Sequence, residues 1–149
     1  MLNQEKQWLP VVENAIQKIK PSIVITFDPS GLTGHPDHIS VSTNIFALVK
    51  EKFPVITLLW YTMPVEIRKN HFDKTLLPYA SSISYSLNLG TSFFAKFRAA
   101  ASYPSQRFGP IIIHPWITIF LMLSKLNQEW YHKVDLAKNY KHKFIEFKI

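Results

Sequence analysis

The densest group of side chains that could do chemistry lies in the stretch DPSGLTGHPDHIS, residues 28–40. His35 and His38 are three residues apart, so they face the same side if a helix begins in this stretch. Asp37 lies between them, where its carboxylate can accept a ring proton and orient a neighbouring imidazole. Two histidines and a carboxylate at this spacing are typical of a metal or acid/base site.

A second interpretation of the same stretch is purely structural. Asp28 or Asp37 would cap a helix, and the two histidines would be solvated turn residues. Catalytic zinc generally takes three protein ligands, whereas an H-x-x-H motif offers one or two. No carboxylate is placed in the sequence to form a tight cluster with the remaining histidines, which are His71, His114, His132 and His142. The spacing alone leaves both interpretations open.

The elements that must position this stretch predict an α/β fold. Residues 22–27 (SIVITF) form a continuous apolar run that suits a strand covered on both faces, and Pro36 suits the first turn of a helix. Helices alternating with strands indicate a mainly parallel sheet, in which ligands bind beyond the carboxyl ends of the strands. The loop after Phe27 lies at such an end. The order that we expect is a helix at 4–19, a strand at 22–27, a loop at 28–34, a helix at 36–52, a strand at 55–61, turns at 64–80, a strand at 82–89, a helix from 91 or 92, a loop at 104–115, a helix at 116–133 and a short strand at 143–149.

The composition excludes several kinds of chemistry and location. The chain has 149 residues, the size of one domain, and no cysteine, which excludes disulfides, Cys-ligated zinc and thiol nucleophiles. Its net charge of +7 is scattered and accompanies no nucleic-acid-binding motif, so we predict no nucleic-acid partner. The N-terminus is amphipathic and carries acids, unlike a signal peptide, and the longest apolar run, residues 110–125, is too short to span a bilayer. We therefore predict no transmembrane segment and a cytoplasmic location.

Residues 21–42 resemble a signature of the LmbE-like, or PIG-L, deacetylase family. The family pattern is a hydrophobic strand, then T-F-D-P-x-G-x-x-G-H-P-D-H, then a helix. The matching residues here are Thr26, Phe27, Asp28, Pro29, Gly31, Gly34, His35, Pro36, Asp37 and His38. Residues 96–106 (KFRAAASYPSQ) are similar to the family's lysine-led helix that ends in Ser-Gln, with Lys96, Ala99, Ser105 and Gln106 in register. The resemblance covers residues from about 10 to 106.

This resemblance implies a Rossmann-like three-layer α/β sandwich with a zinc-dependent hydrolase activity. The expected reaction removes the N-acetyl group from an N-acetylglucosamine-type sugar conjugate, a small-molecule substrate. By the resemblance, His38 is a zinc ligand, His35 is the charged or proton-donating group near the oxyanion, and Asp37 holds His35 oriented. Zinc would polarise the amide carbonyl and lower the pKa of its bound water, and a carboxylate would act as general base.

One family motif, A-H-P-D-D-E, is absent from this sequence, whose only H-P-D is residues 35–37. In the family that motif carries the other zinc ligands and the general base. We therefore expect residues 1–149 to form a single domain that corresponds to the C-terminal two-thirds of a member, without its first strands. Our hypothesis is a fragment, a split subunit or a degenerate copy. A further departure is Thr33, where some members carry Tyr.

Three functional hypotheses follow, and the sequence does not decide whether this chain alone is an enzyme. The first is the zinc-dependent deacetylase. The second is a non-catalytic module that binds a sugar conjugate, or pairs as an oligomer or with a complementing chain that supplies the missing motif. The third is a basic binder of nucleic acid or membrane surfaces. We expect a solvated position for the following cations: Arg68, Lys69, Arg98 and Arg107. We expect core or pocket-wall positions for Trp60, Trp116 and Trp130, and a structural role for His114.

Overall fold

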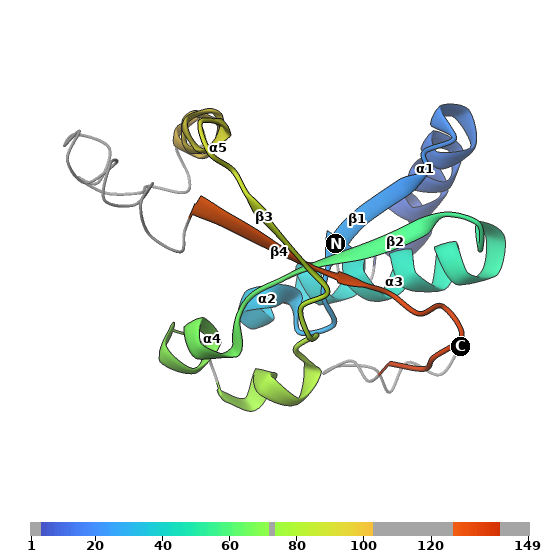
Figure 1. Ribbon diagram of the computed structural model, residues 1–149. Helices are drawn as coiled ribbons and strands as arrows, with labels where there is room; N and C mark the ends of the chain where they lie inside the picture. The colour runs from blue at the N-terminus through green and yellow to red at the C-terminus, as the bar shows by residue number, and fades with distance from the viewer. Residues whose placement is uncertain (1–3, 72–73, 103–126, 141–149) are drawn as a thin grey trace. The chain divides into compact units, whose positions relative to one another are not determined.

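The computed structural model describes residues 4–71, 74–102 and 127–140 (Figure 1). The elements in chain order are α1 (Glu5–Ile19), β1 (Ile23–Phe27), α2 (Gly31–Gly34), α3 (Pro36–Lys52), β2 (Thr57–Thr62), α4 (Val65–His71), a 3-10 helix η1 (Lys74–Tyr79), β3 (Tyr85–Asn88), α5 (Ser92–Ala101) and β4 (Gln128–Lys133). The helices expected at 4–19 and 36–52 and the strands expected near 22–27, 55–61 and 82–89 are all confirmed. The strand expected at 143–149 and the loop expected at 104–115 lie outside the described residues.

The four described strands form one sheet in the order β1-β2-β4-β3. β1 and β2 are parallel, from Ile23 opposite Thr57 to Phe27 opposite Tyr61, and α3 provides the crossover between them. β2 and β4 are antiparallel, from Leu59 opposite Lys133 to Thr62 opposite Trp130. The α/β class is therefore confirmed. The expected mainly parallel sheet is wrong for the described strands, because β4 pairs with β2 in the opposite direction.

Local sequence signals explain where the helices before and after β1 begin and end. Lys20 takes a left-handed conformation after α1, and its N–H donates to the carbonyl of Ile16, which closes the helix before Pro21. Pro36 occupies the start of α3, where the missing N–H of proline costs no helical hydrogen bond. These two boundaries place β1 and its following loop between two well-formed helices.

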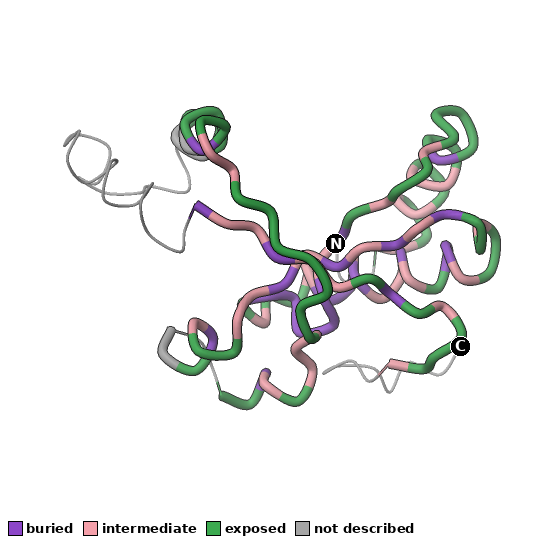
Figure 2. Tube along the Cα trace, in the orientation of Figure 1, coloured by how far each residue is buried: buried purple, intermediate pink, exposed green. Residues whose placement is uncertain are grey.

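The core of the described residues lies where α1 and α3 pack on one face of β1 and β2 (Figure 2). Burial alternates along β2, with Leu58, Trp60 and Thr62 buried, as expected for a strand with one covered face. The ring of Trp60 meets that of Tyr140 with centroids 4.5 Å apart. The expectation that β1 is covered on both faces is wrong for the described part of the chain, because Ile23 is 50% exposed and Ile25 is 56% exposed.

Two further expectations about secondary structure are corrected. Residues 128–133 form the strand β4 rather than the end of a helix at 116–133, whose earlier part lies outside the described residues. Trp130 and Val134 are buried and lie four residues apart, a spacing that fits a helix as well as a strand, so the sequence pattern alone does not identify this strand. Pairing with the second edge of β2 satisfies the backbone of this segment. The region 64–80, expected to contain only turns, holds α4 and η1.

The chain divides into two compact units. The first comprises Met1–Tyr85 and Trp130–Ile149 and contains the core described above. The second is Ser86–Glu129, in which Phe93 of α5 is buried and Lys96 pairs with Glu129 at 2.7 Å. A search of the described residues for a helix able to cross a membrane finds none.

Because the core is assigned to one face of β1 and β2, replacing two strand leucines by alanine should lower the free energy of unfolding by different amounts. Leu58 in β2 is 1% exposed, whereas Leu87 in β3 is 53% exposed. Leu58→Ala should lower the free energy of unfolding by about 2–5 kcal/mol, because it leaves a cavity against the helices. Leu87→Ala should change it by less than about 1 kcal/mol. Urea unfolding followed by circular dichroism measures both, and equal losses would contradict the core assignment.

Candidate functional site

His38 lies in the first turn of α3, close to the carboxyl end of β1, and is half-buried. Its Nδ1 is 3.2 Å from the carbonyl oxygen of Gly31. Its ring stacks on Phe27, with centroids 4.0 Å apart and planes 9° from parallel. Because a carbonyl oxygen can only accept, Nδ1 carries the proton in this hydrogen bond, and the lone pair of the neutral ring is on Nε2. This arrangement suits a histidine that binds a metal through Nε2.

His35 is exposed and forms the N-cap of α3, where its Nδ1 accepts a hydrogen bond from the backbone N–H of Asp37 at 3.2 Å. An accepting Nδ1 leaves the proton of the neutral ring on Nε2. The rings of His35 and His38 have centroids 5.1 Å apart. The structure therefore brings the three predicted site residues together at the end of β1. Their roles as metal ligand, oxyanion donor and orienting group stay predictions.

The carboxylate of Asp28, the first residue after β1, is fully buried and organises the loop that follows. Its Oδ1 accepts from Ser30 twice, from the backbone N–H at 3.1 Å and from Oγ at 2.5 Å. The same oxygen accepts from the backbone N–H of Leu32 at 3.4 Å. A carboxylate that accepts from backbone and hydroxyl donors two and four residues further along the chain fixes the path of that loop.

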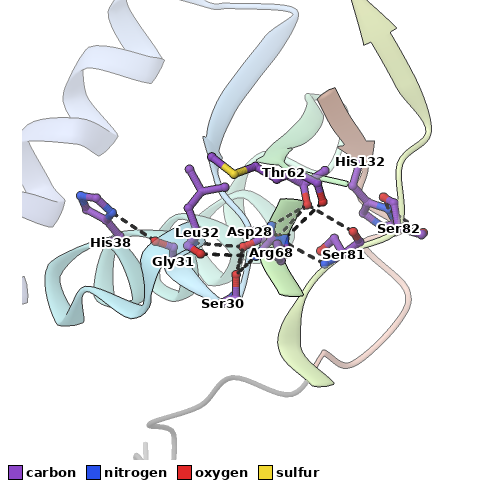
Figure 3. A network of polar contacts seen from close by, with 11 residues as sticks. Asp28, Ser30, Gly31, Leu32, His38, Thr62, Arg68, Ser81, Ser82 and His132 are labelled. Atoms are coloured by element: carbon purple, nitrogen blue, oxygen red, sulfur yellow. Dashed lines mark hydrogen bonds and ion pairs between the residues drawn. The ribbon is translucent and has the colours of Figure 1, made fainter. Parts of the chain in front are cut away.

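The charge of Asp28 is balanced by Arg68 of α4, whose side chain is 2% exposed (Figure 3). Nη2 of Arg68 is 2.5 Å from Oδ2 of Asp28, and Nη1 donates to Oγ of Ser30 at 2.6 Å. Oδ2 also accepts from Oγ1 of Thr62 at 2.8 Å and from the backbone N–H of Ser81 at 3.3 Å. The buried pair is thus both charge-balanced and hydrogen-bonded, as burial of two charges requires.

The solvated position expected for Arg68 is wrong, because its side chain is 2% exposed and pairs with Asp28. Its partner Asp28 lies 40 residues upstream, and no local pattern connects them. The sequence feature that could have indicated a buried cation was Asp28 itself, because it directly follows a strand predicted to be buried. A carboxylate buried at that position needs a counter-charge from elsewhere in the chain. Of the other cations, Lys69 and Arg98 are exposed as expected, and Arg107 lies outside the described residues.

The described residues fit zinc only in part. His38 has the geometry of one ligand, with Nδ1 held by a carbonyl and Nε2 carrying the lone pair. Within the ranges that the structure describes, no group of three or more His, Cys, Asp or Glu residues is placed to hold a metal ion. Catalytic zinc sites use three protein ligands, so these residues do not complete one. No chemical step through zinc can be derived from them.

Comparisons with known proteins find two curated relatives over parts of the chain. One, from Corynebacterium diphtheriae, is 36% identical over 63 residues, covering 42% of this chain and 21% of that protein. The other, from Rhodococcus opacus, is 39% identical over 49 residues, covering 30% of this chain and 17% of that protein. Both are named 1D-myo-inositol 2-acetamido-2-deoxy-alpha-D-glucopyranoside deacetylase.

These similarities are local. The matched segments span about one fifth of the length of the first relative and less of the second, 21% and 17%. No protein-family model matches the chain. No solved structure matches it.

The buried ion pair predicts a large cost for removing one of its charges. Asp28→Asn leaves the guanidinium of Arg68 buried without a counter-ion, and the free energy of unfolding should fall by about 3–5 kcal/mol. The matched control is Asp135→Asn, whose carboxylate is 50% exposed and 3.7 Å from Lys138. That change should cost less than about 1 kcal/mol. Urea unfolding measures both, and similar small losses would contradict a buried, paired Asp28.

Two glycines with positive φ should differ in how much stability the protein loses when each is replaced by alanine. Gly31 has φ +63° and Gly90 has φ +51°, so alanine is strained by about 1–2 kcal/mol at either position. A Cβ at Gly31 would lie 2.7 Å from Cγ1 of Ile39, whereas a Cβ at Gly90 meets nothing within 4 Å. Gly31→Ala should therefore cost about 1–3 kcal/mol more than Gly90→Ala. Thermal melts of the two variants test this difference, which an equal shift would refute.

Proposed function

We propose that this chain is the histidine-bearing part of a zinc-dependent deacetylase that acts on N-acetylglucosamine-type sugar conjugates. In this proposal residues 1–149 correspond to the C-terminal two-thirds of a Rossmann-like domain of the LmbE-like family. His38 contributes one zinc ligand, His35 faces the developing oxyanion, and Asp37 helps to orient His35. The remaining ligands and the general base come from a further segment of the same or another polypeptide.

The observation that carries the proposal is the opposite environment of the two Nδ1 atoms at the end of β1, since Nδ1 of His38 faces a carbonyl oxygen and Nδ1 of His35 faces a backbone N–H. Neutral His38 holds its proton on Nδ1 and offers the lone pair of Nε2, as a metal ligand must. Neutral His35 accepts at Nδ1 and carries its proton on Nε2, as a donor to a substrate oxygen must. The names of the two partial relatives support the reaction class and the type of sugar, since both are called deacetylases of an acetamido-glucopyranoside.

The position of β1 supports a completing segment. β1 is the outer strand of the described sheet. It pairs with β2 along one edge, and no described strand pairs with its other edge. Ile23 and Ile25, on its uncovered face, are 50% and 56% exposed. An apolar strand with an open edge is suited to accept a further strand, which would bring new side chains to the carboxyl end of β1. Because an added strand extends the sheet in its own plane, a helix or loop joined to that strand, rather than the strand itself, would cover these isoleucines.

A non-catalytic function is the second candidate, and the lack of a ligand cluster among the described residues favours it for the chain alone. Such a module would bind the sugar conjugate through the same loop without hydrolysing it. Ligand-observed NMR with the acetylated inositol glucosaminide distinguishes the two candidates. Binding without release of acetate, in every preparation, would favour the non-catalytic module.

The direct test compares the chain purified alone with the tagged chain purified from its own cells. Each preparation is assayed for bound zinc and for acetate released from the acetylated inositol glucosaminide. The preparation from cells should contain one zinc per chain and release acetate. His38→Ala should remove both, whereas His35→Ala should keep zinc and slow release about 100-fold to 10,000-fold.

The chain alone should bind zinc weakly and release no acetate, because one imidazole does not hold a catalytic zinc. Tight zinc and turnover from the chain alone would contradict the need for a completing segment. Zinc that survived His38→Ala would contradict the ligand assignment. Absence of acetate release in both preparations would contradict the deacetylase function itself.

A further inference from the structure

The peptide bond between Gly31 and Leu32 links the buried ion pair to His38. Its N–H, from Leu32, donates to Oδ1 of Asp28 at 3.4 Å. Its carbonyl oxygen, from Gly31, is 3.2 Å from Nδ1 of His38. Figure 3 shows His38 and Arg68 on opposite sides of this peptide. Because N–H and C=O point in opposite directions across a trans peptide, anchoring the N–H on Asp28 directs the carbonyl toward His38.

The backbone around this peptide is held in an unfavourable conformation. Leu32 has φ 61° and ψ −64°, the geometry of a γ-turn that is rare and strained in proteins. Such a conformation persists only where the surrounding contacts over-determine it. Arg68 supplies two of these contacts, because Nη1 donates to Oγ of Ser30 at 2.6 Å and reaches the carbonyl oxygen of Leu32 at 3.5 Å.

We propose that Arg68 and Asp28 are positioning residues that select the tautomer of His38. Together they hold the residues on either side of Gly31, so that its carbonyl accepts from Nδ1 of His38 and leaves the lone pair on Nε2. Phe27 fixes the plane of the same ring by stacking on it. Neither Arg68 nor Asp28 contacts His38 directly in this scheme, and their effect passes through one peptide bond.

A role of Arg68 and Asp28 in catalysis rests on the proposed function. The tautomer of His38 that they select does not depend on that function. A metal-binding imidazole whose second nitrogen is held by a carbonyl is already oriented before the metal arrives, and loss of such a contact typically weakens metal binding about 10-fold to 100-fold. The tautomer of His38 can be measured without zinc, substrate or a partner. A failure of the deacetylase assay therefore does not contradict the inferred tautomer. Likewise, a different tautomer of His38 does not by itself contradict the deacetylase function.

The test is long-range ¹H–¹⁵N NMR of the histidine side chains at about pH 8.5, where histidine rings are neutral. His38→Gln assigns the signals of His38. In the unmodified chain, Nδ1 should have the chemical shift of a protonated nitrogen and Nε2 that of an unprotonated one. Arg68→Lys keeps a charge but lacks the planar fork that reaches Ser30 and Leu32, so the preference for the Nδ1–H tautomer should fall about tenfold.

The matched control is Arg98→Lys, at an exposed position of α5, which should leave the shifts of His38 unchanged. Backbone amide spectra establish that β1, β2 and α3 are intact in each variant. A His38 that carries its proton on Nε2 in the unmodified chain would overturn the inference without any Arg68 variant. A folded Arg68→Lys chain with an unchanged tautomer ratio would overturn the role of Arg68.

Discussion

The buried ion pair of Asp28 and Arg68 is the contact on which the candidate site depends. Both charged side chains lie out of water, at 0% and 2% exposure, and a buried charge is tolerated only when it is paired and hydrogen-bonded. The pair therefore constrains its surroundings. It ties the end of β1 to Thr62 at the end of β2, to α4 and to Ser81, and it sets the path of the loop that leads to the histidines.

The two histidines owe their different chemical properties to backbone rather than to side-chain partners. His38 donates to a carbonyl that the buried pair orients, and His35 accepts from the N–H that starts α3. One ring thus offers a lone pair and the other a proton, although both belong to one short motif. This division follows from the loop and the helix start. The site is in this sense prepared by the fold, even though the described residues do not supply a full set of ligands.

Much of this arrangement could be predicted from local sequence. The apolar run at 22–27, Pro36 at the helix start and the HPDH motif gave the strand, the helix and the group of His35, Asp37 and His38 at the carboxyl end of β1. The partner of Asp28 could not be predicted, because nothing near Arg68 in sequence marks it as buried. The direction of the sheet was also mispredicted, since the pairing of β4 with β2 depends on contacts between residues about 70 apart along the chain, as in Leu59 opposite Lys133.

The central claim is that Arg68 acts on His38 through the loop between them, and a double-mutant cycle measures this most directly. Unfolding free energies are determined for the unmodified chain, Arg68→Met, His38→Ala and the double variant. Residues joined through a shared backbone segment should show a coupling energy of about 0.5–3 kcal/mol, even without direct contact. Losses that add to within about 0.3 kcal/mol would contradict the account, because they would show that the ion pair and His38 are independent.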